Sequence, residues 1–411
     1  MLDIIVIFVG SMAAIVAFYR YVLGWLFRLI KWLQPNKYDI GSKVDKDYSW
    51  QPVVSFTVPC FNEGAHIYET VKTIFAQDWP NDKLEVIIVD DQSSDDTYEW
   101  ALKTKELGNV TVLRNDINCG KRKSLIRATR ITRGEICVSV DSDVVLAPTA
   151  LKELVACFAK NPRIGAVGGK VGISNVNENW ITQTQEVKYF FGYELFKSTE
   201  NAFRTIMCLS GCLTAYRKEA LMEIEDRLAE RKWLGVEIKY GEDRFLTHQL
   251  VLKGWQTIVN LDARCWTKSP TTLQTLFSQQ LRWRRSNIID WIFTVSNIAA
   301  HVRKINPVVI FYYFALALYI MAYPVVFIQA LIGGFGFAIF FAHLIFLFAL
   351  AGIYQTTMFV RGEMGINNTL TYLGLGLILV ISYLLITPLA AFTLDSGSWE
   401  TRTKDNYESE I

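Results

Sequence analysis

A short apolar stretch that ends in acidic residues decides the fold: Leu84-Glu85-Val86-Ile87-Ile88-Val89-Asp90-Asp91. Its β-branched residues up to Val89 are typical of a strand, and the polar cluster that follows is typical of a loop. Working outward, three similar strands are expected at Val53–Val58, Val110–Leu113 and Glu135–Val140. Helical patterns alternate with them at Ala65–Gln77, Thr97–Glu106 and Lys123–Arg133. This alternation predicts an α/β domain with a mainly parallel, Rossmann-like sheet covered by helices.

A polar cluster follows each predicted strand, at residues 59–63, 90–95, 118–122 and 141–143. Because ligands bind at the carboxyl ends of parallel strands, we expect these clusters to converge on one crevice. Asp141 and Asp143 stand two residues apart, so an extended backbone points both carboxylates the same way. Such oxygen ligands suit Mg²⁺ or Mn²⁺ bound jointly with a diphosphate, although Asp-Ser-Asp is also favourable turn chemistry.

The neighbouring clusters carry groups suited to a nucleotide. Lys121 and Arg122 follow a glycine at a strand end, which fits contact with phosphate or, alternatively, a plain charged loop. Glu63 and Asp91 could accept hydrogen bonds from a base or a ribose. The sequence has no GxxxxGK[ST] or GxGxxG pattern after a predicted strand, which excludes P-loop and dinucleotide-binding functions.

The composition limits the class of protein. The 411 residues carry a net charge of +2, so nothing suggests a nucleic-acid partner, and the hydrophobic fraction of 51% is concentrated at both ends of the chain. Seven cysteines without a CxxC pair indicate free thiols in a reducing cytosol rather than disulfides or structural zinc. The four histidines are scattered and are interpreted as structural.

Two further stretches carry chemistry. Residues 208–217 include Cys208, Ser210 and Gly211, and small residues there would let a ligand pass close to the backbone. Gly241-Glu242-Asp243-Arg244 precedes a helical pattern, where its carboxylates either complement the helix dipole or supply a general base. A transfer that inverts an anomeric carbon needs such a base, and Asp243 is our candidate, with Glu242 beside it.

The stretch Gln279-Gln280-Leu281-Arg282-Trp283-Arg284-Arg285 lies just before the apolar C-terminal third. A helix would place Gln279, Arg282, Trp283 and Ser286 on one face, because they are spaced i, i+3, i+4 and i+7. The guanidinium suits a phosphate oxyanion and the flat aromatic ring suits the face of a sugar.

Taken together, these motifs resemble those of the inverting family-2 glycosyltransferases, and specifically the membrane-embedded processive polysaccharide synthases. Asp90-Asp91, Asp141-Ser142-Asp143, Gly241-Glu242-Asp243 and the Gln279–Trp283 stretch are similar, in order and spacing, to the DD, DxD, GED and QxxRW motifs of that family. The branch with hyaluronan synthases, chitin synthases and rhizobial chitooligosaccharide synthase is closer still, on the GKR, SG and GEDRxLT patterns at residues 120–122, 210–211 and 241–247. Trp399-Glu400-Thr401-Arg402 is similar to the WGTR motif of hyaluronan synthases, with Glu in place of Gly.

The resemblance implies a glycosyltransferase-A fold and a role for each matching residue. Glu63, Asp91 and Lys121 would hold uridine, Asp143 with Asp141 would hold the metal, and Asp243 would be the base. Arg282 and Arg402 would contact the diphosphate, with Trp399 in the same tail motif. Trp283 would stack on the acceptor sugar, near Cys208.

The apolar ends predict a membrane protein. Leu2–Tyr19 is long enough to span, and basic residues directly after it put the next region in the cytoplasm. Tyr21–Leu33 is expected to be an interfacial helix. Pro307–Leu331, Gly333–Ile353 and Thr369–Phe392 are further spans, and Ile288–Val302 is expected along the membrane surface. One plus three spans would leave the tail on the wrong side for Arg402. Either one apolar block is re-entrant or split, which we favour, or the tail motif is coincidental.

These expectations divide the chain into six parts. They are a transmembrane helix at 1–20, an interfacial helix and linker at 21–50, the cytoplasmic transferase domain at 51–270, the QxxRW and interfacial helices at 271–305, transmembrane helices at 306–394 and the tail at 395–411. The expected partners are a UDP-sugar, a growing polysaccharide and the bilayer of a plasma or inner membrane. The alternatives are a chitin or β-glucan synthase, a non-processive transferase to a lipid-phosphate acceptor, and a channel or scaffold with a dead transferase domain.

Overall fold

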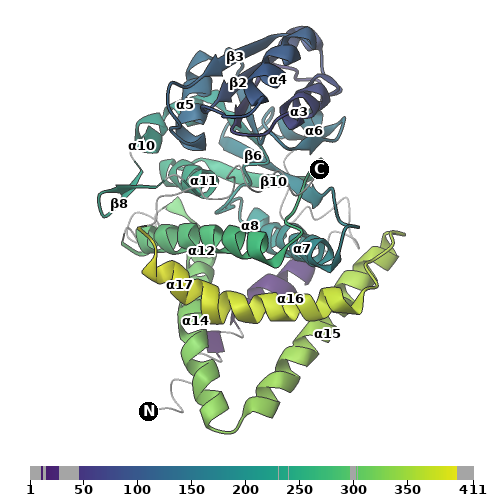
Figure 1. Ribbon diagram of the computed structural model, residues 1–411, viewed down its shortest axis with the longest axis vertical. Helices are drawn as coiled ribbons and strands as arrows, with labels where there is room; N and C mark the ends of the chain where they lie inside the picture. The colour runs from purple at the N-terminus through teal and green to yellow at the C-terminus, as the bar shows by residue number, and fades with distance from the viewer. Residues whose placement is uncertain are drawn as a thin grey trace.

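The computed structural model describes residues 11–12, 15–26, 46–229, 231–238, 240–296, 302 and 304–395. Figure 1 shows an α/β domain at one end and long apolar helices at the other, with a layer of helices between them. The predicted Trp399 and Arg402 contacts, and most of the predicted first span and of the 21–50 segment, lie outside the described residues.

The α/β domain is built on an eight-stranded sheet of order β3-β2-β1-β4-β7-β6-β10-β5. Its strands are β1 Val54–Cys60, β2 Leu84–Asp90, β3 Val110–Arg114, β4 Ile136–Val140, β5 Val145–Leu146, β6 Ile164–Ile173, β7 Leu213–Arg217 and β10 Gln256–Thr267. β3, β2, β1 and β4 are parallel neighbours, as are β6 and β10, whereas β7 and β5 run antiparallel to their neighbours. The four predicted strands and the mainly parallel sheet are therefore confirmed.

Helices cover the sheet and bury its central strands. Every residue of β1, β2 and β4 is buried, as expected of parallel strands with both faces covered. The covering helices include α3 His66–Phe75, α4 Thr97–Lys103, α5 Lys121–Ile131, α6 Ala150–Val155, α9 Lys218–Met222, α10 Glu225–Ala229 and α11 Glu242–Lys253. A small β8–β9 hairpin, Lys232–Trp233 with Val236–Glu237, lies outside the sheet.

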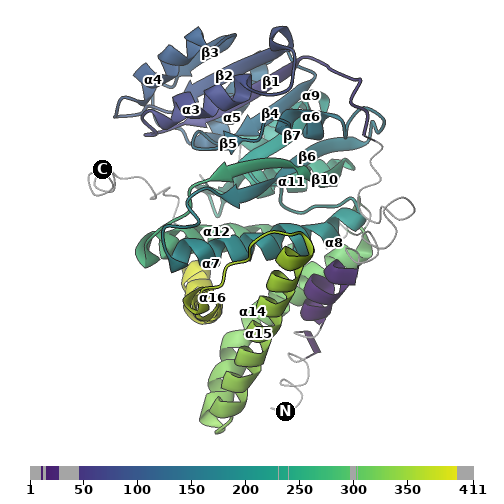
Figure 2. The ribbon, with the colours of Figure 1, turned by 90° about the vertical axis from the view of Figure 1, so that its right-hand side faces the viewer.

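A layer of helices lies under the sheet, and the sequence predicted only one of its two main members. One member is a continuous helical segment of α7 Trp180–Phe190, π-helix η4 Phe191–Phe196 and α8 Lys197–Ala202, and Figure 2 shows it beside α12 Leu273–Ser296. Asn179 starts α7, because its side chain accepts hydrogen bonds from the backbone of Ile181 and Thr182. No helix was predicted from the sequence at residues 180–202.

The predicted surface helix at Ile288–Val302 is not a separate element. α12 runs unbroken through this region to Ser296, and Asp290 is a buried partner of Arg231 at 3.0 Å instead of a polar residue at a membrane surface. The difference comes from tertiary structure. The amphipathic pattern suggests that the Asp290 carboxylate faces solvent, but a guanidinium distant in the sequence forms an ion pair with it.

Three helices are long and apolar enough to cross a membrane, by length and composition: Pro307–Ile332, Gly336–Val360 and Thr369–Phe392. α14 Pro307–Ile332 and α15 Gly336–Val360 form a hairpin that points away from the α/β domain (Figure 1). α15 begins three residues and ends seven residues later than the predicted span, since Gly333 and Gly334 form the turn before it.

The third apolar segment is placed differently from the other two. It comprises α16 Thr369–Ile381, π-helix η5 Ser382–Ile386 and α17 Thr387–Phe392, and it runs across the hairpin beneath α7 and α12 in both views (Figures 1 and 2). A third of its most apolar window is buried in the protein, against 6% for each of the other two helices. Its end returns to the α/β side, where Tyr240 donates a hydrogen bond to the Leu394 carbonyl oxygen at 3.4 Å.

At the N-terminal side, the described helix Ile15–Leu26 continues past the predicted boundary at residue 20. It packs against α14, where Arg20 donates a hydrogen bond to the Tyr312 hydroxyl and the Tyr19 and Tyr312 rings stack at 3.9 Å.

Candidate active site

A cavity of about 920 Å³ lies where the sheet meets the α7 and α12 layer. It brings together thirteen of the residues that the sequence analysis selected: Glu63, Asp91, Lys121, Asp141, Asp143, Cys208, Ser210, Gly211, Glu242, Asp243, Gln279, Arg282 and Trp283. They come from strand ends, a loop and two helix faces that are far apart in the chain. The four polar clusters do converge.

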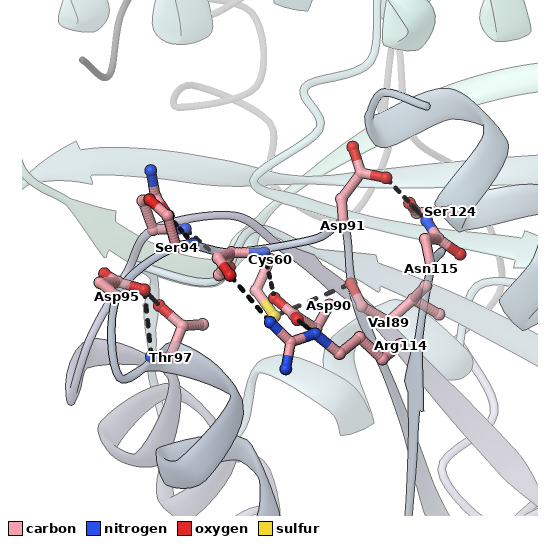
Figure 3. A network of polar contacts seen from close by, with 12 residues as sticks. Cys60, Val89, Asp90, Asp91, Ser94, Asp95, Thr97, Arg114, Asn115 and Ser124 are labelled. Carbon is pink, nitrogen blue, oxygen red and sulfur yellow. Dashed lines mark hydrogen bonds and ion pairs between the residues drawn. The ribbon is translucent and has the colours of Figure 1, made fainter. Parts of the chain in front are cut away.

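Hydrogen bonds within the protein fix the part of the cavity formed by β1 and β2. The Asp91 carboxylate accepts hydrogen bonds from the backbone nitrogens of Cys119 at 3.0 Å and Gly120 at 2.7 Å. It also accepts one from the Asn115 side-chain amide at 2.7 Å (Figure 3). Asp90, its neighbour in the DD motif, is fully buried and pairs with Arg114 at 3.1 Å. Asp91 therefore holds the loop before Lys121 in place, while Asp90 stabilises the sheet edge.

Glu63 is tied to the strand end that carries Asp143. Ser142 donates a hydrogen bond to a Glu63 carboxylate oxygen at 2.8 Å, and the backbone nitrogen of Glu63 donates to Thr97 at 2.7 Å. The first contact connects the loops after β1 and β4, and the second connects the loop after β1 to the start of α4.

Asp143 has the properties of a metal ligand that shares its ion with a substrate. Burial, and then the nearby charge of Asp141, raises the pKa of Asp143 to about 6. A buried carboxylate of this kind gains from a divalent cation, and carboxylate oxygens suit Mg²⁺ or Mn²⁺. Across the described ranges no three His, Cys, Asp or Glu side chains gather into a metal site. The remaining ligands would therefore have to come from diphosphate oxygens and water.

Lys121 lies between two carboxylates. It forms an ion pair with Asp141 and another with Glu242 at 3.0 Å. Burial alone would lower the pKa of Lys121, but these two charges raise it well above its usual value. Gly211 makes room for this cation, because a Cβ there would lie 2.7 Å from the lysine Nζ.

Asp243 and Glu242 begin α11, and their environments separate their roles. Burial and the charge of Glu242 raise the pKa of Asp243. Burial acts on Glu242 in the same direction, but Lys121 outweighs it and lowers the pKa of Glu242. The more basic carboxylate is thus Asp243, while Glu242 stays ionised and holds Lys121. Gly241 is required before them: its φ is +69°, and a Cβ would lie 1.9 Å from the Ser286 hydroxyl oxygen.

One face of α12 closes the cavity. Gln279, Arg282, Trp283 and Ser286 all line it, which confirms the predicted i, i+3, i+4, i+7 face. The Trp283 side chain keeps 37% of its surface exposed, so its ring is open to a ligand.

Arg122 does not line the cavity, although it was predicted with Lys121. Its guanidinium is buried and donates to the Ile238 carbonyl oxygen at 2.7 Å and to Glu237 at 3.1 Å. The two residues open α5, and successive helical side chains point about 100° apart, so only one of them faces the cavity.

The cavity also contains residues that the sequence analysis missed. They come from the helical segment under the sheet: Lys188, Tyr189, Gly192, Tyr193 and Lys197. The available signal was Asn179 and Thr182 as a capping pair, at the start of the eleven-residue stretch Trp180–Phe190, which contains neither Gly nor Pro.

The family model described as glycosyltransferase-like family 2 matches residues 52–286 of the chain. The chain belongs to this family. Its match covers β1 through to Ser286 on the cavity face of α12, and so includes every described residue chosen above.

Named relatives fall in the branch that the motifs suggested. An N-acetylglucosaminyltransferase of Bradyrhizobium diazoefficiens is 32% identical over 244 residues, which cover 58% of this chain and 50% of that protein. The hyaluronan synthase of Streptococcus pyogenes is 30% identical over 263 residues, covering 62% and 61%. The chain thus spans between a half and two thirds of the length of the relatives it matches.

Among solved structures, the mannosyltransferase PcManGT from Pyrobaculum calidifontis, in complex with GDP-Man and Mn²⁺, is similar with a TM-score of 0.57. The similarity covers 94% of this chain and 97% of that one at 20% sequence identity, so it concerns the fold. The predicted glycosyltransferase-A fold with C-terminal apolar helices is confirmed.

Proposed function

We propose that this chain is a membrane-embedded processive polysaccharide synthase. It transfers sugar from a UDP-sugar to a growing β-linked chain with inversion and passes the polymer out between its own apolar helices. The donor is UDP-GlcNAc, alone for a chitin-like product or alternating with UDP-GlcA for hyaluronan. The α/β domain then faces the cytoplasm at a plasma or inner membrane. The names of the relatives support this choice of sugars.

The observation that carries the proposal is the composition of one cavity. It holds a buried carboxylate with a raised pKa, a guanidinium and an open indole ring, Asp243, Arg282 and Trp283, on the side of the domain that meets the apolar helices. A base, a cation for the leaving diphosphate and a platform for the acceptor sugar are what a single inverting displacement requires.

Each residue has a part in that displacement. Glu63, Asp91 and Lys121 hold the uridine end, Asp91 by fixing the loop that carries Lys121. Asp143, helped by Asp141, would hold a divalent cation, which when bound neutralises charge on the diphosphate. Asp243 accepts the proton of the attacking hydroxyl, and Arg282 balances the departing diphosphate. Cys208, Ser210 and Gly211 border the acceptor, while Gln279 completes the α12 face.

The position of α16–α17 supports a role for the C-terminal tail. Because that segment runs across the hairpin and Leu394 contacts Tyr240, which lines the cavity, the chain after Asp395 starts on the α/β side. This position of α16–α17 supports the proposal that one apolar block is re-entrant, and with it a role for the tail motif on the diphosphate side.

The test is to give membranes that contain the protein each UDP-sugar singly and in pairs, with Mg²⁺ or Mn²⁺. A high-molecular-weight product should form and be degraded by chitinase or by hyaluronidase, whichever matches the donors used. A product degraded only by a glucanase would move the assignment to a β-glucan synthase. Release of short products, or of none, under all donor combinations would rule out processive synthesis.

A further inference from the structure

Lys188 lies in the cavity next to the acceptor platform. It belongs to α7, and its side chain reaches across to α12, where Nζ donates a hydrogen bond to the Gln280 side-chain oxygen. The same Nζ lies 5.5 Å from the centroid of the Trp283 ring. A sugar that packs against this ring comes within reach of the amine.

This lysine differs from Lys121 in its charge partners. Across the residues that the structure describes, no carboxylate forms an ion pair with Lys188. Burial, and then the positive charge of Arg284, lowers the pKa of Lys188 to about 7. Lys121, in the same cavity, has two carboxylates for its one charge. An anion beside Lys188 would therefore supply a partner that the described residues do not.

Lys188 lies on a different element from the donor groups at the sheet edge, Lys121, Asp141 and Asp143. Its amine lies against α12, at Gln280 and at the open indole ring of Trp283. Arg282, the one α12 residue assigned to the diphosphate, is next to Trp283 in the sequence. Because the amine lies 5.5 Å from the centre of the Trp283 ring, the anion that we assign to it is one carried by the sugar that packs on this ring. In a polysaccharide assembled from UDP-sugars, that anion is the carboxylate of a uronic acid.

We propose that Lys188, supported by Gln280, binds a carboxylate of the acceptor sugar that packs on Trp283, so that the growing chain contains uronic acid. This rests on the proposed function, which makes Trp283 the acceptor platform. A charge-assisted hydrogen bond in a partly buried site discriminates strongly between a carboxylate and a hydroxymethyl group. On this proposal Lys188 determines specificity for the acceptor sugar and takes no part in proton transfer.

The experiment measures equilibrium binding of two oligosaccharides to the full-length protein in detergent. One is a hyaluronan hexasaccharide, which has uronate carboxylates, and the other is chitohexaose, which is neutral. The wild-type protein should bind the uronate chain about tenfold more tightly, as expected for one charge-assisted hydrogen bond. Lys188→Gln should remove this difference without changing the Kd of chitohexaose, and Lys188→Arg should keep it.

The matched control is Lys152→Gln, because Lys152 is an exposed lysine that pairs with Asp78 away from the cavity. It should leave both affinities unchanged. If Lys188→Gln weakens the binding of both oligosaccharides equally, the lysine only positions Trp283, and the proposal is overturned. A loss of UDP affinity in the same variant would assign it to the diphosphate and overturn the proposal as well.

A separate measurement keeps the two proposals apart. If labelled UDP-GlcNAc is consumed and chitohexaose binds, but the uronate gives no advantage, only the carboxylate site is wrong. If no UDP-sugar is consumed and neither oligosaccharide binds, the synthase function itself fails.

Discussion

Two lysines in one cavity mark two regions with opposite electrostatic design. Lys121 lies at the carboxyl edge of the sheet between Asp141 and Glu242, and its pKa is raised despite burial. Lys188 lies at the α7–α12 layer beside Trp283, and its pKa is lowered to about 7. The first region is held together by internal hydrogen bonds and ion pairs. In the second, the Lys188 amine bonds to Gln280 but forms no ion pair among the described residues. We infer that the sheet edge is preorganised for the nucleotide that each donor carries, while the helix layer determines which acceptor is used.

The largest effect should come from the base at the junction of the two regions. Asp243→Asn removes the proton acceptor but keeps the shape, so transfer should fall roughly 10³-fold while UDP affinity stays within about twofold. Transfer from labelled UDP-GlcNAc and equilibrium UDP binding measure the two quantities. Lys152→Gln, on the exposed surface, is the control. Transfer that survives in the asparagine variant would remove Asp243 from the mechanism.

The stability of the protein with either lysine replaced tests the comparison between the two regions. Lys121→Met leaves Asp141 and Glu242 without their shared cation, and it should cost about 3 kcal/mol. Lys188→Met breaks no ion pair of the described residues and removes a buried amine, so it should be neutral or stabilising. Thermal unfolding of the two variants side by side decides the matter. Equal losses of stability would end the distinction between the regions.

Substitution of Trp283 should weaken acceptor binding and leave the affinity for UDP unchanged. Trp283→Ala removes an exposed ring that forms one wall of the cavity, and binding of chitohexaose should weaken about tenfold, the scale of an aromatic contact. Trp283→Phe keeps a smaller ring and should lose less. UDP affinity, measured in parallel, should not change in either variant; a parallel loss would place Trp283 with the donor.

The pH dependence should show the raised pKa of Asp243. The base acts when it is deprotonated, so the rate is present above its pKa and falls about tenfold per pH unit below it. Since burial and Glu242 raise that pKa, the acid limb should lie above the ordinary aspartate value of about 3.9. Initial rates between pH 4 and 8 on the purified enzyme give the limb, and a midpoint at or below the ordinary value would contradict the assignment.

Much of the donor region was readable from the sequence because its residues stand at regular positions. Strand ends in a parallel sheet meet at one edge, so the polar clusters after β1, β2 and β4 had to converge. The α12 face was readable for a similar reason, since helical periodicity alone places Gln279, Arg282, Trp283 and Ser286 together. The prediction that Arg122 lines the cavity failed because a motif specifies only neighbours in sequence. Of two adjacent residues on a helix, one must point away from the cavity that the other faces.

By itself, the sequence determined the α/β domain, the DxD, GED and QxxRW groups and the presence of apolar helices. These follow from local spacing and from strand and helix periods. Only the tertiary structure decided what pairs with what: that Asp290 pairs with Arg231, that α16–α17 runs across the hairpin, and that Lys188 from an unpredicted helix lies beside Trp283. Charge pairing and burial depend on contacts between segments that are far apart in the sequence, and no local pattern encodes such contacts.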